Sequence, residues 1–361
     1  MTHISPTPIP HITLGLAAIA VLVLMMPFLV KKVEENLEPF FLFMGVAAVT
    51  TSNLWSGELV LEALKAPVMI GKMPIGIFQV VLIIGFLIHY LNDPFCNLVL
   101  HLEHKLGHKL FLFLLIVFFG LFSSVISVIL TAVLLSEIAA ALPIAKKVKV
   151  ELIVVSCFAV GLGAVLTPLG EPLSTLLVAK LKGAPYFAGF AFPFKHFAVY
   201  LIPGVFAVAL FGAFWLGPRV KAHRELHIAR HKEKVKAVVV RALKVYLFVA
   251  ALVLLGEGFK PLIVWYFQKI PGEALYWINT LSAVLDNATL TAVEIGPGLT
   301  LAQITGIVMG LSIAGGMLIP GNIPNIVAAC RLKISMKSWA KIGLPIGLAI
   351  MAIYFVILYV L

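Results

Sequence analysis

Apolar runs of about 20 residues recur along this 361-residue chain and limit its fold more than any other feature of the sequence. Hydrophobic residues make up 61% of the chain and charged residues 12%, whereas soluble proteins carry about 25% charged residues. A bilayer offers no water to an exposed backbone, so runs of this length cross it as helices. We therefore predict an all-α polytopic membrane protein with about eight spanning helices.

Positive charge lies between the apolar runs. The net charge is +11, and lysines gather in short segments such as Lys31-Lys32 and residues 146–149. Basic loops of this kind are typical of the cytoplasmic side of a membrane protein, so we expect a lipid bilayer and no nucleic acid as partner. The most charged segment, residues 219–244, is predicted to be a cytoplasmic linker, and both termini are predicted to be external. A signal peptide has its basic residues before its apolar segment, whereas the apolar residues 12–30 are followed by Lys31-Lys32. We therefore expect a retained helix there.

Two apolar stretches are too short for two crossings of the membrane, which need about 20 residues each. Residues 110–142 have basic segments on both sides, and residues 274–298 are interrupted at Asp286-Asn287. Each stretch is therefore predicted to enter and leave on one side, as a re-entrant hairpin.

Two further apolar runs contain proline and glycine in their interior. Residues 151–182 are interrupted at 167–172, and residues 301–332 at 320–324. Proline removes a backbone donor and interrupts a helix. An interruption at membrane depth is tolerated where protein surrounds it or where it lines a cavity. We predict one broken helix in each half of the chain.

The two halves share short motifs in the same order. Leu-Thr-Ala-Val occurs at residues 130–133 and 290–293, and Pro-x-x-x-Pro at residues 168–172 and 320–324. Because the first hairpin has basic flanks and the second is predicted to open outward, we expect inverted repeats, which are typical of transporters. The predicted parts are an N-terminal helix in residues 1–36, a first repeat in 37–218, the linker in 219–244 and a second repeat in 245–361.

Oxygen-bearing side chains and glycines gather at these interruptions. A carboxylate inside a membrane is costly unless something pairs with it, so it indicates a functional site. The candidates in the second half are Asp286, Asn287, Thr289, Gly321, Asn322 and Asn325. Those in the first half are Ser124, Ser127, Thr131, Thr167, Gly170 and Glu171. Oxygen ligands suit hard cations, so we predict a sodium site in which Asp286 supplies the full negative charge.

The two candidate carboxylates have no acidic counterpart in the other half. Asp286 corresponds to Ile126 and Glu171 to Ile323. Burial favours the protonated form of a carboxylate, and a bound cation favours its ionised form. Competition between a proton and a cation for one carboxylate is the minimum requirement of an antiporter. We therefore predict exchange of sodium for protons, without a cofactor.

Two other functions stay open. A sodium-coupled symporter of an anion or a small organic acid would need a hydroxyl-lined or cationic pocket, for which Ser123, Ser124 and Ser127 are the candidates. A non-transporting sensor or channel would instead use histidine faces that sense pH or bind a metal, namely His101, His104 and His108, and His223, His227 and His231. We expect no enzyme, because HExxH and GxSxG motifs are missing.

The hairpin and break motifs of the second half carry a family resemblance. Leu285-Asp286-Asn287-x-Thr289-Leu-Thr291 and Pro320-Gly321-Asn322-x-Pro324-Asn325 resemble motifs of NhaD-type sodium/proton antiporters and arsenite-pump membrane proteins in the ion transporter superfamily. The resemblance runs from residue 37 to the C-terminus and is closest to a poorly characterised group of cation transporters. In the first half, Leu169-Gly170-Glu171-Pro172 only approximates the Gly-Asp-x-Pro of the superfamily.

The resemblance implies an elevator mechanism in the cytoplasmic membrane of a prokaryote. Hairpins and broken helices would form the moving transport domain, and the other helices a scaffold that forms a homodimer. The motif positions correspond here to Asp286, Asn287, Asn322 and Asn325, and more loosely to Thr167, Gly170 and Glu171.

Overall fold

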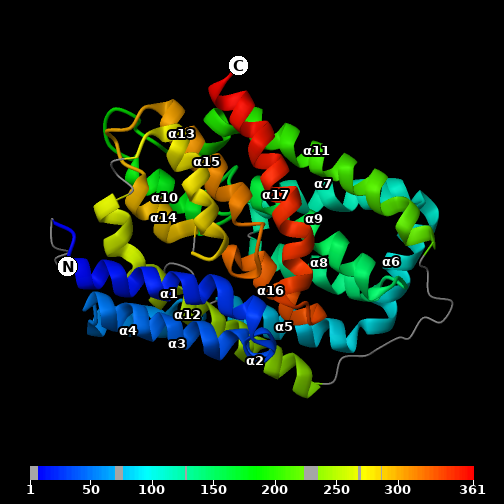
Figure 1. Ribbon diagram of the computed structural model, residues 1–361. Coiled ribbons are helices and arrows are strands. Elements are labelled where there is room, and N and C mark those ends of the chain that lie inside the picture. The colour runs from blue at the N-terminus through cyan, green and yellow to red at the C-terminus, as the bar shows by residue number, and fades with distance from the viewer. Residues whose placement is uncertain (1–6, 70–75, 127, 223–234, 267–269, 286) are drawn as a thin grey trace.

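The computed structural model describes residues 7–69, 76–126, 128–222, 235–266, 270–285 and 287–361 (Figure 1). Among these residues it contains helices and no strand, which confirms the all-α class. The helices of the first half are α1 (Pro10–Leu29), α2 (Lys31–Glu35), α3 (Leu37–Ser52), α4 (Gly57–Lys65), α5 (Ile77–Tyr90), α6 (Asn92–Leu106), α7 (His108–Ile126), α8 (Val128–Ala141), α9 (Lys146–Ala164), α10 (Pro172–Lys180) and α11 (Phe192–Ala222). Those of the second half are α12 (Val235–Tyr266), α13 (Gly272–Ile278), η2 (Asn279–Ala283), α14 (Asn287–Glu294), α15 (Leu301–Ala314), η3 (Ile319–Gly321), α16 (Ile323–Leu332) and α17 (Met336–Tyr359).

Five of the described helices are long and apolar enough to cross a membrane, namely α1, α7, α11, α12 and α17. This agrees with an integral membrane protein. The expected number of about eight crossings stays a prediction, because these five are the single described helices of spanning length and do not include shorter or broken ones. Helices α3 and α5 have 16 and 14 residues, less than the roughly 20 that a full crossing needs.

The predicted linker at residues 219–244 overlaps a helix at each end, because α11 continues to Ala222 and α12 already begins at Val235. The reason is that charges of this segment are paired with acids of other helices. Arg241 Nη1 lies 2.7 Å from Glu137 Oε1, and Lys244 Nζ lies 3.3 Å from Glu38 Oε1. The helix can therefore continue through charged sequence. Residues 223–234, the middle of the predicted linker, lie outside the described residues.

Ion pairs gather at one end of the helix bundle. Glu137, near the end of α8, accepts hydrogen bonds from Arg241 at the start of α12 and from Arg331 at the end of α16. Arg219, near the end of α11, pairs with Glu151 near the start of α9 at 2.7 Å. We call this the ionic end; the predicted cytoplasmic segments meet there.

The start of α1 and the end of α17 lie at the opposite end. The hydroxyl of Tyr266, the last residue of α12, lies 3.3 Å from that of Thr13 near the start of α1. At the C-terminus, the hydroxyl of Tyr359 donates to the carbonyl of Gly272, six residues beyond Tyr266 in the sequence, at 3.4 Å. That this end faces outward stays a prediction, based on the positive charge of the ionic end.

Each predicted hairpin consists of two helical arms. Helices α7 and α8 form the first, and α13 with η2 and then α14 form the second. At 19 residues, α7 is long enough to cross a membrane on its own, so the argument from length does not hold for that arm. The return of either hairpin inside the membrane stays a prediction.

The two halves pack crosswise. Helix α8 from the first hairpin lies against α16, which follows the second break, and α14 from the second hairpin lies against α10, which follows the first break. Figure 1 shows α10 and α14 side by side. Each hairpin therefore contacts the broken helix of the other half, and the inverted repeat stays a prediction.

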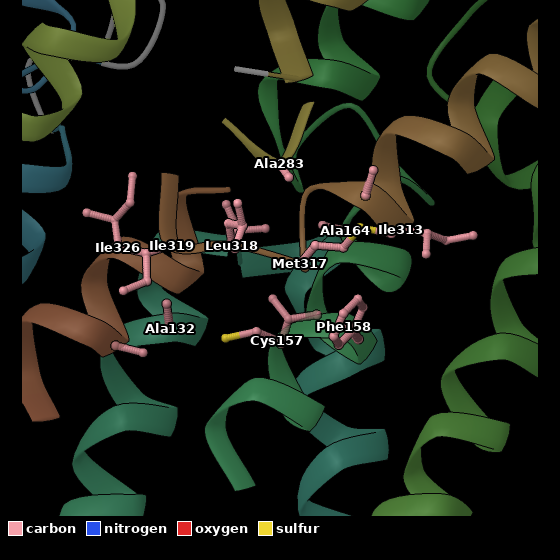
Figure 2. Close-up of a cluster of buried hydrophobic side chains, with 14 of the residues drawn as sticks. Ala132, Cys157, Phe158, Ala164, Ala283, Ile313, Met317, Leu318, Ile319 and Ile326 are labelled. Atoms are coloured by element: carbon pink, nitrogen blue, oxygen red, sulfur yellow. The ribbon is translucent and has the colours of Figure 1, made fainter. Parts of the chain in front are cut away.

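Both predicted helix breaks are present. Helix α9 ends at Ala164 and α10 begins at Pro172; α15 ends at Ala314 and α16 begins at Ile323. Figure 2 shows the second break surrounded by apolar side chains: those of Leu318 and Ile319 gather with others from α8, α9 and α16, including Ala132, Cys157, Phe158 and Ile326. The break is thus buried in protein, where unpaired backbone groups can be tolerated.

Candidate functional site

Backbone oxygens converge on two glycines of the second break. A methyl group on Gly321 would lie 2.5 Å from the Gly315 carbonyl oxygen and 2.9 Å from the Ser282 carbonyl oxygen. A methyl group on Gly315 would lie 3.1 Å from the Gly321 carbonyl oxygen. Glycine is therefore required here for close approach. The carbonyls of Gly315, Gly321 and Ser282 define what we call the carbonyl cluster.

Asn287 places its side chain against this cluster. A methyl group on Gly315 would meet Asn287 Nδ2 at 2.7 Å and Oδ1 at 3.2 Å. The side chain is only 4% exposed, and neither polar atom has a hydrogen-bond partner among the described residues. An unpaired buried amide costs about 1–3 kcal/mol, so it indicates a ligand.

Asn325 and Asn322 are also at the second break, and one polar side-chain atom of each has a hydrogen-bond partner. Asn325 Nδ2 donates to the carbonyls of Gly315 and Leu318, each at 2.8 Å. Asn322 Oδ1 accepts from the backbone N–H of Ile323 at 2.8 Å, at the start of α16. Asn325 Oδ1 is buried and lacks a partner among the described residues. Both asparagines hold the break, and Asn325 also offers one oxygen.

The first break is joined to the tip of the first hairpin. Thr167 Oγ1 donates to the Ser124 carbonyl, and the Gly170 carbonyl accepts from the backbone N–H of Val128 at 2.9 Å. Glu171 is buried at the N-cap position of α10. A carboxylate at a helix N-terminus is favoured by the helix dipole. Thr167, Gly170 and Glu171 therefore share one region, as predicted.

The other predicted site residues lie elsewhere or outside the described residues. Thr131 is fully buried on α8. Thr289 contacts Gly256 of α12, where a methyl group would meet its Oγ1 at 2.2 Å; since it is two positions from Asn287 on a helix, it points to another side. The predicted site residues Asp286 and Ser127 lie outside the described residues.

The serines proposed for an anion pocket use their hydroxyls on backbone carbonyls. Ser123 donates to the carbonyls of Gly120 and Val160, and Ser124 to that of Leu121. Ser127 is not described. The two described hydroxyl donors are thus engaged, which leaves them poorly suited to bind an anion.

The histidine faces provide no metal centre where the structure describes them. No group of three or more His, Cys, Asp or Glu side chains that could hold a metal occurs there. His101 and His104 are exposed on α6, and His108 contacts Glu103. His223, His227 and His231 lie outside the described residues.

Sequence reasoning missed several buried polar residues of the second hairpin. Asn279, Ser282 and Thr291 are all fully buried, and no motif singled them out as site residues. The signal was present in α14, where Asn287, Thr291 and Glu294 follow at spacings of four and three and so share one helical face.

Comparison with known families gives one result. The family described as "Protein of unknown function (DUF1646)" matches residues 13–361. The chain belongs to the DUF1646 family. No curated protein matches it. The match includes both hairpins and both breaks, so the candidate site lies within the part that defines the family; the likeness to the ion transporter superfamily stays a prediction from motifs.

Proposed function

We propose that this DUF1646 protein is a secondary active transporter that exchanges a monovalent cation, with sodium as the first candidate, for protons. The observation that carries the proposal is Asn287, a buried amide without a hydrogen-bond partner that lies against the carbonyl cluster. Several oxygens lie nearby, namely the carbonyls of Gly321 and Ser282 and Oδ1 of Asn287 and Asn325; Asn287 Nδ2 is a donor without a partner among the described residues. Oxygen ligands without sulfur or imidazole suit a hard cation.

The electrostatics of the two breaks disfavour an anion. Helix N-termini attract negative charge, and both α10 and α16 begin at a break. The N-cap positions are already occupied by Glu171, a carboxylate, and by Asn322, whose oxygen caps the helix. With Ser123 and Ser124 also engaged, the cation transporter is preferred to the anion symporter.

Carboxylates supply the proton side of the exchange. Glu171 is buried at the first break, and Asp286 directly precedes Asn287 in the sequence. A buried carboxylate gains from either a proton or a cation. Helices α10 and α14, which follow Glu171 and Asp286, pack together, and this contact supports a shared site.

Crosswise packing also supports an elevator mechanism. Each hairpin contacts the broken helix of the other half, so the four elements could move as one body. Helices α3 and α12 make an extensive contact with each other and are candidates for the scaffold. Homodimer formation through that scaffold is part of the proposal.

The test is flux in proteoliposomes that contain a pH-sensitive dye, with each alkali cation added in turn. In the wild type, addition of sodium should drive proton flux. In Asn287→Ala the rate of that flux should fall at least about tenfold, as expected for loss of a ligand. Asp286→Asn, chosen from the sequence, should do the same. Asn97→Ala, at an exposed asparagine of α6, is the control.

Two outcomes would contradict the proposal. The first is a wild type that is folded and monodisperse but moves no protons with any alkali cation. The second is full flux in Asn287→Ala. Flux driven by an organic anion together with sodium would favour the symporter instead.

A further inference from the structure

A row of buried polar side chains leads away from Asn287 along the second hairpin. Asn287, Thr291 and Glu294 share one face of α14. Asn279 and Ser282 lie one turn apart on η2. All five are buried. Polar residues of this density in an apolar segment require an explanation.

The far end of the row is a carboxylate with an amide. Asn279 Nδ2 donates to Glu294 Oε2 at 3.0 Å. Asn279 is fully buried and Glu294 only 8% exposed. Glu294 Oε1 and Asn279 Oδ1 have no hydrogen-bond partner among the described residues. Both of these atoms are acceptors, so a cation satisfies them and an anion does not.

A buried carboxylate with a structural role has different partners in this protein. Glu137 is also buried, and its two oxygens accept hydrogen bonds from Arg241 and Arg331 at 2.7–2.8 Å. Glu294 has one neutral donor and no cationic side chain as partner in the described part of the chain. An ionised carboxylate without a charged partner is expensive to bury, so it takes up either a proton or a mobile cation.

The pair lies between the break and the surface. Glu294 follows Asn287 by seven positions along α14, a rise of about 10 Å. Beyond Glu294, residues 297 and 298 are exposed. An ion that enters from this surface would meet Glu294 before it reaches the carbonyl cluster.

We propose that Glu294 and Asn279 form a second binding site for a monovalent cation, distinct from the cluster at Asn287. Glu294 supplies the charge through Oε1, and Asn279 Oδ1 supplies a neutral oxygen. The site is a station on the ion's route between the carbonyl cluster and the surface. This role as a station rests on the proposed transport function; cation binding itself does not.

The experiment is sodium titration of the purified full-length protein in detergent, with choline chloride to keep the ionic strength constant. Two readouts are used: the unfolding midpoint, which rises when a ligand binds the folded state, and infrared difference spectra of carboxylate stretching bands. In Asp286→Asn, which lacks the carboxylate of the first site, sodium should still shift a carboxylate band. Adding Glu294→Gln, which keeps the side-chain shape, should remove that remaining shift and weaken the remaining sodium response at least about tenfold.

Two further variants make the test specific. Asn279→Ser leaves the Glu294 carboxylate in place but replaces the neutral ligand with a shorter one. The shift of the carboxylate band should therefore remain, but a higher sodium concentration should be needed to produce it. Glu273→Gln, at an exposed acid of the adjacent α13, should behave as the wild type. An unchanged band and sodium response in folded Glu294→Gln would overturn the inference.

The outcomes separate this inference from the proposed function. If the protein shows sodium-dependent flux and Glu294→Gln responds to sodium normally, the proposed transport function stands and the second site is contradicted. If the sodium response depends on Glu294 but the protein shows no flux, the second site stands and the proposed transport function is contradicted.

Discussion

Asn325 illustrates how a residue can be correctly located and yet have a role that the sequence does not reveal. From the motif at residues 320–325, Asn325 was predicted to lie at a helix break. The side-chain nitrogen is used on the carbonyls of Gly315 and Leu318, which brings together positions ten and seven residues upstream. That closure depends on the path of the break, which propensity alone does not determine. The partner-free amide of Asn287 likewise follows from three-dimensional packing.

Asn325→Asp should destabilise the protein. Aspartate has the same shape but cannot donate when ionised, so two buried carbonyls lose their donor and face a negative charge. Each unsatisfied buried group costs about 1–3 kcal/mol. Thermal unfolding in detergent measures the effect, and Asn97→Asp on the exposed face of α6 is the control. An unchanged midpoint in Asn325→Asp would contradict this role.

Gly315→Ala should impair both stability and sodium-dependent flux. Its methyl group would lie 2.7 Å from Asn287 Nδ2, a distance at which the side chain must shift. Overpacking of this kind typically costs about 1–3 kcal/mol. Gly298→Ala, where nothing lies within 4 Å of the added carbon, should leave both properties unchanged. Equal behaviour of the two variants would mean that the close approach at Gly315 is unimportant.

Among the helices and breaks, local chemistry determined what the sequence could predict. Proline and glycine close together interrupt a helix, so both breaks were located within a few residues, whereas single prolines lie inside α1, α11, α12 and α17. The start of α12 at Val235 was missed because charged residues suggested a loop, whereas Arg241 and Lys244 pair with acids more than one hundred positions away in the sequence. The amphipathic α4 was not predicted.

Glu137→Gln tests whether the ionic end holds α8, α12 and α16 together. The substitution removes the negative charge with which the buried Arg241 and the largely buried Arg331 both pair. Removal of one partner of a buried ion pair costs about 3–5 kcal/mol. Glu257→Gln, which breaks a partly exposed pair with Lys260 on α12, should cost less than about 1 kcal/mol. Similar unfolding midpoints for both variants would contradict the role assigned to Glu137.

At the scale of the whole molecule, the two ends of the bundle differ in chemistry. Ion pairs that involve Glu38, Glu137 and Glu151 occupy the ionic end, and tyrosine hydroxyls join the segments near the termini at the other. The basic segments of the sequence predicted this polarity, since positive charge is retained in the cytoplasm. The crosswise contact of hairpins and broken helices could be predicted only through the weak repeat, because it joins segments far apart in the chain.

Single cysteines at the two ends test the orientation of the whole molecule. In a variant without Cys96, Cys157 and Cys330, a membrane-impermeant maleimide applied to intact cells should label Gly298→Cys and Leu361→Cys but not Lys147→Cys or Lys333→Cys. The latter two should react only after permeabilisation, because basic segments stay in the cytoplasm. All four positions are exposed in the structure, so a lack of labelling reports the membrane barrier and not burial. The reverse pattern would mean that the molecule is inserted the other way round. Labelling of Lys147→Cys and Gly298→Cys from the same side would contradict the inverted repeat. The first and the second hairpin would then open on the same face of the membrane.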